Sequence, residues 1–87
     1  SAGARAQAEV LRGLLKQRAG DDAAKYRSIA VLQAALADLP GDTKVSGISD
    51  GDGDGLDDDG KLVVEMNGAR TCFRVEGTNT TVGDDAC

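Results

Sequence analysis

The chain has 87 residues, with 15 acidic side chains, 10 basic side chains and a formal net charge of −5. This length indicates one small domain. Its apolar content, mostly Ala, Leu and Val with one Phe, one Tyr and no Trp, indicates a thin core that needs an additional staple. The chain contains no His, so the commonest general base and zinc ligand is missing.

Charge is divided unevenly along the chain. Residues 1–45 carry seven Lys/Arg against five Asp/Glu, whereas residues 46–87 carry three against ten. A basic front and an acidic back argue against nucleic-acid binding by the isolated domain, although the front alone is able to lie near an anionic surface. No apolar run of about eighteen residues occurs. We therefore expect membrane contact only through a segment removed upstream of the Ser-Ala-Gly-Ala start.

Residues 3–19 predict a helix, because good helix formers dominate and proline is absent. A second helical segment is expected from Ala23 to Leu39, ended by Pro40-Gly41. The first helix carries a narrow apolar stripe at helical spacing, with Val10 and Leu14 beside it. The stripe residues are Ala4, Ala8, Leu11 and Leu15.

The connection between these two segments is open to two interpretations. Gly20 suits the end of a helix, and Asp21 or Asp22 suits the start of the next one. Yet Leu11 and Ile29 lie five helical turns apart, so the apolar stripe keeps its phase across Gly20. One long frayed helix and two helices at a corner both fit, and a break or kink near Gly20 is favoured.

The clearest local signal is a β-hairpin. Residues 61–66 and 69–76 read as strands around the two-residue turn Asn67-Gly68. This register places Glu65 opposite Arg70, a favourable cross-strand charge pair. One face of the hairpin then collects the apolar side chains of Leu62, Val64, Met66, Ala69, Phe73 and Val75. We expect the helices to cover that face, with a weak strand within residues 44–49 and a third strand within residues 78–82.

The two cysteines offer one way to stabilise the thin core, a disulfide. Cys72 falls on the hairpin face opposite the core, and Cys87 ends the sequence, so the tail must fold back over that face to reach it. In a small, glycine-rich acidic domain this pattern favours a disulfide and an exported location, with two free thiols as the alternative. Closing a loop of roughly sixteen residues contributes about 3 kcal/mol.

The acidic stretch Asp50–Lys61 offers a second staple, a metal. Six aspartates lie within ten residues, separated by glycines, and would repel one another without a counter-ion. Laid on the EF-hand calcium loop, the first half is a strong match, whereas Lys61 stands where a bidentate glutamate should close the site. The predicted Ca2+ ligands are Asp50, Asp52, Asp54, the Leu56 carbonyl and Asp58. Asp57, Asp59, Glu65 or water must then complete the shell. The alternative is a solvated, flexible acidic loop.

Taken together, these features resemble the soluble part of a type IV pilin or a type II secretion pseudopilin. Residues 4–39 match the amphipathic half of the family's long helix, residues 61–76 match its small sheet, and Cys72 with Cys87 matches its pinned C-terminal region. The family's apolar N-terminal run, with a glutamate near its start, is not present in the sequence. The break near Gly20 also departs from an uninterrupted pilin helix. The resemblance implies a single pilin-like domain over residues 1–87, with a helical stem over 1–40 and a loop and sheet over 41–87.

The predicted fold class is therefore α+β, with an amphipathic helix packed on a small antiparallel sheet, a calcium-type loop and a C-terminal disulfide. The leading functional hypothesis is a structural subunit of an extracellular filament at the cell surface, whose partners are copies of itself or related pilins. The alternative is a free-standing secreted calcium-binding module, adhesive or protein-binding. An enzyme is disfavoured, because a glycine-rich loop does not hold carboxylates at the fixed separation that acid–base or two-metal chemistry requires.

Overall fold

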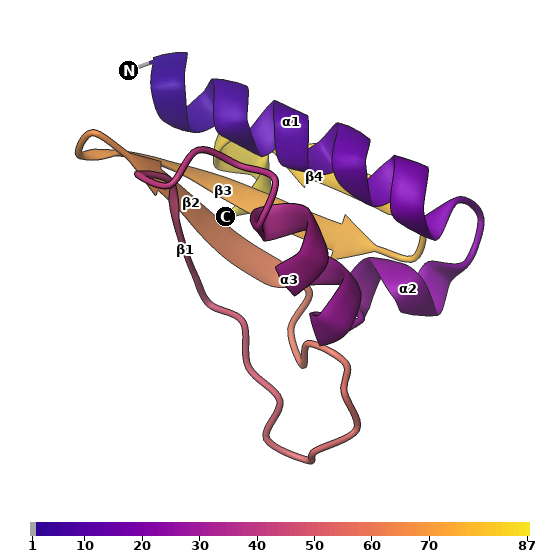
Figure 1. Cartoon of the computed structure of the whole chain (residues 1–87). Coiled ribbons are helices and arrows are strands. Elements are labelled where there is room, and N and C mark those ends of the chain that lie inside the picture. The colour runs from indigo at the N-terminus through magenta and orange to yellow at the C-terminus, as the bar shows by residue number, and fades with distance from the viewer. Residues whose placement is uncertain (1) are drawn as a thin grey trace.

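The computed structural model describes residues 2–87 and shows an α+β domain in which helices cover one face of a four-stranded antiparallel sheet (Figure 1). The elements follow in the order α1 (Ala2–Ala19), α2 (Ala23–Arg27), α3 (Ile29–Leu36), β1 (Lys44–Ser46), β2 (Lys61–Met66), β3 (Ala69–Glu76), β4 (Asn79–Val82) and the 3-10 helix η1 (Asp84–Ala86). Each strand pairs with its neighbour in sequence, because the strand order in the sheet is β1-β2-β3-β4. The predicted fold class, helix on a small antiparallel sheet, is confirmed.

The core lies between the helices and the inner face of the sheet. The four predicted stripe residues of α1 are at most 1% exposed, and two of them are alanines, whose small side chains let the helix lie close to the strands. Val10, expected beside the stripe, is instead 47% exposed and lies on the solvent side of α1. The other buried apolar residues include Tyr26, Leu32, Ala35, Leu62, Val64, Phe73 and Val75.

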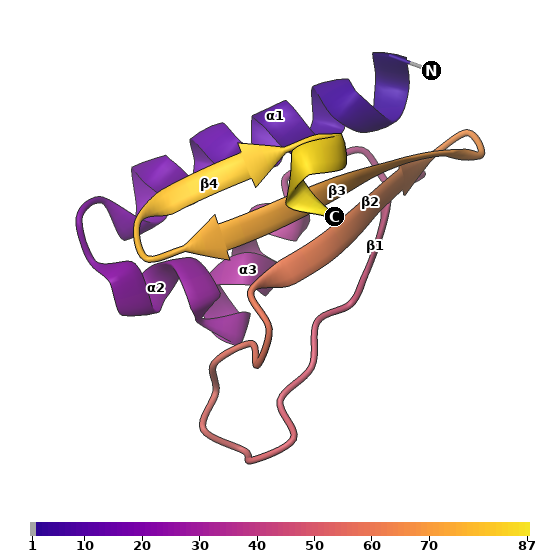
Figure 2. The ribbon, with the colours of Figure 1, turned by 180° about the vertical axis from the view of Figure 1, so that it is seen from behind.

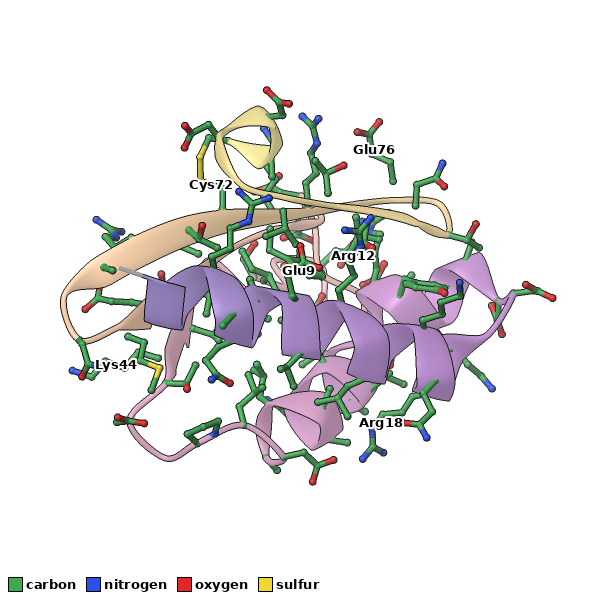
Figure 3. The ribbon with its side chains drawn as sticks, turned by 90° about the horizontal axis from the view of Figure 1, so that it is seen from above. Glu9, Arg12, Arg18, Lys44, Cys72 and Glu76 are labelled. Carbon is green, nitrogen blue, oxygen red and sulfur yellow. A yellow bond between two sulfur atoms is a disulfide. The ribbon has the colours of Figure 1, made fainter. Side chains whose placement is uncertain are left out.

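Side chains at the two flanks of α1 tie it to elements on either side (Figure 3). Arg12 Nε donates to Thr80 Oγ1 of β4 at 3.0 Å. On the other flank, Arg18 Nη2 contacts Asp38 Oδ2 at 2.7 Å, just beyond α3. Both contacts are exposed, so each contributes little to stability and serves mainly to set the orientation of the helix.

The predicted break near Gly20 is confirmed. Gly20 has a φ of 58°, in the left-handed region that ends helices, and its amide donates to the Lys16 carbonyl at 2.9 Å. Asp22 then caps α2, because its side chain accepts the Ala24 amide at 3.1 Å. The hydroxyl of the buried Tyr26 donates to the Gly20 carbonyl at 2.8 Å, which fixes the corner.

The prediction of one helical segment from Ala23 to Leu39 is wrong at Ser28. There the backbone is extended (φ −64°, ψ 122°), which ends α2 and begins α3. Ser28 caps α3 by accepting the Val31 amide on its hydroxyl at 3.3 Å, and it forms an isolated antiparallel bridge with Leu56 of the acidic loop. Hydrogen bonds to a segment distant in sequence thus replace those of a continuous helix at this point.

The hairpin has the predicted register: Leu62 pairs with Phe73, Val63 with Cys72 and Glu65 with Arg70. The two outer strands are shorter than expected. β1 ends at Ser46 rather than continuing to Ser49, because the acidic loop turns away there, and β4 begins at Asn79 after the turn. On the inner face Leu62, Val64, Phe73 and Val75 are buried, whereas Met66 and Ala69, next to the turn of the hairpin, are half-buried.

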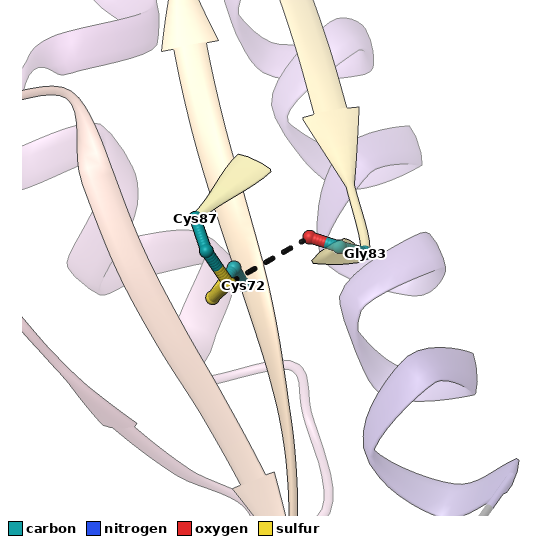
Figure 4. Close-up of a disulfide and its surroundings, with 3 residues drawn as sticks. All are labelled: Cys72, Gly83 and Cys87. Carbon is teal, nitrogen blue, oxygen red and sulfur yellow. Dashed lines mark hydrogen bonds between the residues drawn. A yellow bond between two sulfur atoms is a disulfide. The ribbon is translucent and has the colours of Figure 1, made fainter. Parts of the chain in front are cut away.

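The C-terminal tail covers the outer face of the sheet, as predicted (Figure 2). After β4, the Gly83 amide donates to the Cys72 carbonyl at 2.9 Å, and η1 brings Cys87 back to Cys72, with 5.4 Å between their Cα atoms. The two cysteines form a disulfide, so the free-thiol alternative is excluded in this structure (Figure 4). Because a disulfide sulfur carries no proton, the 4.0 Å approach of Cys87 Sγ to the Gly83 carbonyl is a packing contact.

Candidate metal centre

The acidic loop connects β1 to β2 and projects away from the body of the domain (Figure 1). Its two arms return to adjacent strands of the sheet, so its ends are held close together. Glycines and aspartates alternate through its first half, and the side chains there turn back to bind the loop's own backbone amides. These hydrogen bonds within the loop shape its first half.

Three carboxylates converge in the loop. Oxygen atoms of Asp50, Asp52 and Asp58 all lie within 4.8 Å of one another. Asp50 is partly buried, and the other two residues are exposed. Like charges at this spacing repel, and a divalent cation among them reverses the sign of that interaction. This group is able to bind a metal ion.

Asp50 holds the first turn of the loop. Its Oδ1 accepts the Asp54 amide at 3.1 Å, and its Oδ2 accepts the Gly55 amide at 2.9 Å. The Gly55 amide, with further hydrogen bonds from Asp52 and Asp54, holds the pKa of Asp50 below its ordinary value. Asp52 Oδ1 also accepts the Asp54 amide, at 3.3 Å. That amide acts to lower the pKa of Asp52, but the neighbouring Asp50 and Asp54 carboxylates and desolvation outweigh it, so its pKa lies above the ordinary value.

Asp58 joins the group from the other arm of the loop. Its Oδ2 accepts the Gly51 amide at 2.8 Å, and its own amide donates to the Ser49 carbonyl at 2.8 Å. The side chain therefore crosses from one arm to the other. This cross-link accounts for the proximity of Asp58 to Asp50 and Asp52, which lie eight and six positions earlier in the sequence.

Two predicted ligands, Asp54 and Leu56, lie outside this converging group. The Asp54 carboxylate accepts the Leu56 amide at 2.9 Å, and Asp54 is exposed. The bridge between Leu56 and Ser28 uses the Gly55 carbonyl and the Asp57 amide, on either side of Leu56. The structure thus brings together three of the four predicted carboxylate ligands. A ligand role for Asp54, or for the Leu56 carbonyl, stays a prediction.

Asp57 has a role that the sequence pattern does not predict. The pattern offers it only as a substitute ligand, but it is 1% exposed, and both of its oxygens accept hydrogen bonds from backbone amides. Oδ1 accepts from Ser49 at 2.8 Å and Oδ2 from Gly60 at 2.7 Å. The available signal was its position three residues before Gly60, a spacing at which aspartate side chains bind backbone amides. Of the other proposed substitutes, Asp59 is exposed, and Glu65 lies on β2 with its Oε1 3.7 Å from Arg70 Nε.

Fold and site together define the class: a small disulfide-linked α+β domain whose acidic loop brings together three carboxylates that are able to hold a metal ion. No family model matches the chain, and no curated protein or solved structure shows significant similarity to it. Among residues 2–87, no helix combines the length and the apolar character needed to cross a membrane.

Proposed function

We propose that this chain is a structural subunit of an extracellular filament, of the type IV pilus or secretion pseudopilus kind, with a head stabilised by one calcium ion. The observation that carries the calcium assignment is the convergence of Asp50, Asp52 and Asp58 within 4.8 Å. The filament assignment is supported by the architecture, in which α1 lies along an antiparallel sheet and a disulfide pins the C-terminal tail. The role is structural rather than enzymatic, and the partners are copies of the chain or related subunits.

Calcium is favoured over other cations by the chemistry of the loop. Its donors are carboxylate and carbonyl oxygens, which suit hard cations, and calcium accepts six to eight of them in irregular geometry. Magnesium demands a tight octahedron, which a glycine-rich loop does not impose easily. Because Lys61 replaces the closing glutamate, protein ligands are few, and the expected dissociation constant is about 10⁻⁴ to 10⁻³ M, in the range of extracellular modules.

Thermal melts with calcium, with magnesium and with a chelator test the metal assignment. Calcium at about 100 times its dissociation constant should stabilise the native state by roughly 2.7 kcal/mol. This corresponds to a rise in Tm of about 10 to 20 °C for a domain of this size. Asp52→Ala is the control that should abolish the rise. If the melts of the wild-type protein coincide in all three conditions, the loop is a solvated linker and the calcium assignment is wrong.

The filament assignment is tested on the natural full-length protein. Its coding sequence should contain, upstream of this domain, an apolar segment of about twenty residues with a processing site and a glutamate near its start. The processed protein should sediment with cell-surface filaments that an antibody against this domain decorates. Recovery of the processed protein only as a free monomer in the medium would contradict the assignment.

One observation favours the alternative, a free-standing secreted binding module. A polar groove of about 690 Å³ lies between α1, the α1–α2 corner and the β3–β4 turn, with Arg12, Lys16, Tyr26 and Asn79 in its lining. Such a groove offers hydrogen-bonding groups to a ligand or a partner protein. The same upstream sequence separates the two candidates, because a secreted module needs only a cleaved signal peptide.

A further inference from the structure

We propose that Arg27, a residue of α2 far from the acidic loop in sequence, is the positioning residue of the proposed metal site. Its side chain holds the arm of the loop that carries Asp58, and in this way it sets the affinity of the site for calcium. The inference rests on the proposed calcium function and adds a control point that lies outside the loop. It is carried by the contacts between the α2–α3 junction and residues 55–58.

Both the side chain and the backbone of Arg27 form hydrogen bonds with the acidic loop. Its Nε donates to the Asp57 carbonyl at 2.9 Å, and its Nη2 donates to the same carbonyl and to the Asp58 carbonyl, the latter at 3.0 Å. The Arg27 carbonyl accepts the Asp57 amide at 2.7 Å. A planar guanidinium with several donors is well suited to fix two successive carbonyls at once. Arg27 therefore fixes the backbone at Asp57 and Asp58, from which the Asp58 side chain reaches across to the Gly51 amide.

Ser28 and Ile29, the next residues of the α2–α3 junction, add further backbone contacts with the loop. Ser28 forms the isolated bridge with Leu56, and the Ile29 amide donates to the Gly55 carbonyl at 2.9 Å. Residues 50–54, in contrast, make their described hydrogen bonds within the loop itself, at exposed positions. The loop thus has one arm anchored to the helices, which carries Asp58, and one self-supported arm, which carries Asp50 and Asp52. An ion can bind only when the carboxylates of the two arms face the same point.

The direction in which calcium affinity changes when Arg27 is replaced distinguishes a positioning role from a purely electrostatic one. If Arg27 acted only as a nearby positive charge, its removal would strengthen cation binding, because one repulsive charge would be lost. If Arg27 positions Asp58, its removal should weaken binding despite the lost repulsion. Outer residues that orient metal ligands typically contribute about 10- to 100-fold to metal affinity.

The test is a calcium titration by isothermal calorimetry of the wild-type protein, Arg27→Gln, Arg27→Lys and Lys25→Gln. Lys25 is an exposed cation two residues earlier on α2, so Lys25→Gln removes the same charge as Arg27→Gln and serves as the matched control. We expect Arg27→Gln to weaken calcium binding by about 10-fold or more. Lys25→Gln should leave affinity unchanged or slightly increase it. Lysine at position 27 can donate to one carbonyl but lacks the planar guanidinium that binds two carbonyls at once. The calcium affinity of Arg27→Lys should therefore fall between those of Arg27→Gln and the wild-type protein.

Amide hydrogen exchange in a chelator is the second readout, because it needs no metal. Exchange at Asp57 and Asp58 should accelerate in Arg27→Gln and not in Lys25→Gln. Equal or tighter calcium binding by Arg27→Gln would overturn the proposal. If the wild-type protein binds no calcium, the proposed function fails and the affinity claim fails with it, whereas the exchange result still decides whether Arg27 positions the loop. Should Arg27→Gln not fold, weaker binding by Arg27→Lys supports the proposal and unchanged binding overturns it.

Discussion

Asp57 and Ser49 are joined across the base of the acidic loop: the buried carboxylate of Asp57 accepts the Ser49 amide at 2.8 Å. Its other oxygen accepts the Gly60 amide, so the Asp57 side chain links the two ends of the loop. A buried carboxylate is costly unless it is hydrogen-bonded, and here both oxygens are. One aspartate of the acidic run thus supports the backbone, and its neighbour Asp58 faces the candidate site.

Replacing Asp57 should therefore destabilise the fold even without any metal. Asp57→Ala leaves two amides without their partner, at about 1 to 3 kcal/mol each. We expect a total loss of about 2 to 6 kcal/mol in the free energy of unfolding, measured by denaturant titration in a chelator. The adjacent exposed Asp59→Ala should stay within about 0.5 kcal/mol and also reports the benefit of removing one negative charge. Equal effects of the two variants would contradict a supporting role for Asp57.

Asp52 and Asp54 should differ in their effect on calcium binding. An EF-hand alignment treats both as ligands, but only Asp52 lies in the converging group. Asp52→Asn should remove most of the calcium-induced rise in Tm. Asp54→Asn should remove much less, because the asparagine oxygen still accepts the Leu56 amide that Asp54 binds at 2.9 Å. Equal losses in calorimetric titrations of the two variants would mean that the ion draws Asp54 into its shell.

Alanine at two glycines that both have open space should change stability in opposite directions. Gly68, in the hairpin turn, has a φ of 81°, whereas Gly13 lies within α1, and a Cβ at either position meets no atom within 4 Å. Gly68→Ala should lower the free energy of unfolding by about 1 kcal/mol or more, because alanine is strained in the left-handed region. Gly13→Ala should add about 0.5 to 1 kcal/mol, because glycine is a poor helix former. Thermal melts decide the matter, and the hairpin assignment would be wrong if Gly68→Ala melted at or above the wild-type temperature.

Loss of the Cys72–Cys87 disulfide should reduce stability by about 3 kcal/mol in the chain-entropy model. The expected product is a protein whose C-terminal tail separates from the outer face of the sheet and exposes Ala86, which is 1% exposed in the folded domain. Denaturant unfolding of a Cys72→Ser, Cys87→Ser double variant measures the loss. Intact mass after alkylation supplies the control. Protein from an oxidising compartment should take up no label until it is reduced, and labelling of both thiols without reductant would contradict the disulfide.

Local signals in the sequence predict the local part of the structure. The register of β2 and β3 follows from Asn67-Gly68, because a two-residue turn leaves one pairing that keeps the apolar side chains on one face. The buried stripe of α1 follows from helical periodicity. For the corner at Gly20 and for the disulfide, the sequence favours the observed outcome but leaves an alternative open, and the structure resolves both.

The use of the acidic loop, in contrast, depends on tertiary contacts. The extended backbone at Ser28 and the hydrogen bonds of Arg27 to the Asp57 and Asp58 carbonyls join segments about thirty residues apart. Local propensity favours helix through Ser28, and no periodicity distinguishes Asp57 from the exposed aspartates around it. The physical reason is that a backbone amide donates to, and a backbone carbonyl accepts from, any partner of suitable geometry, and chain folding, not residue type, determines which partner comes within reach.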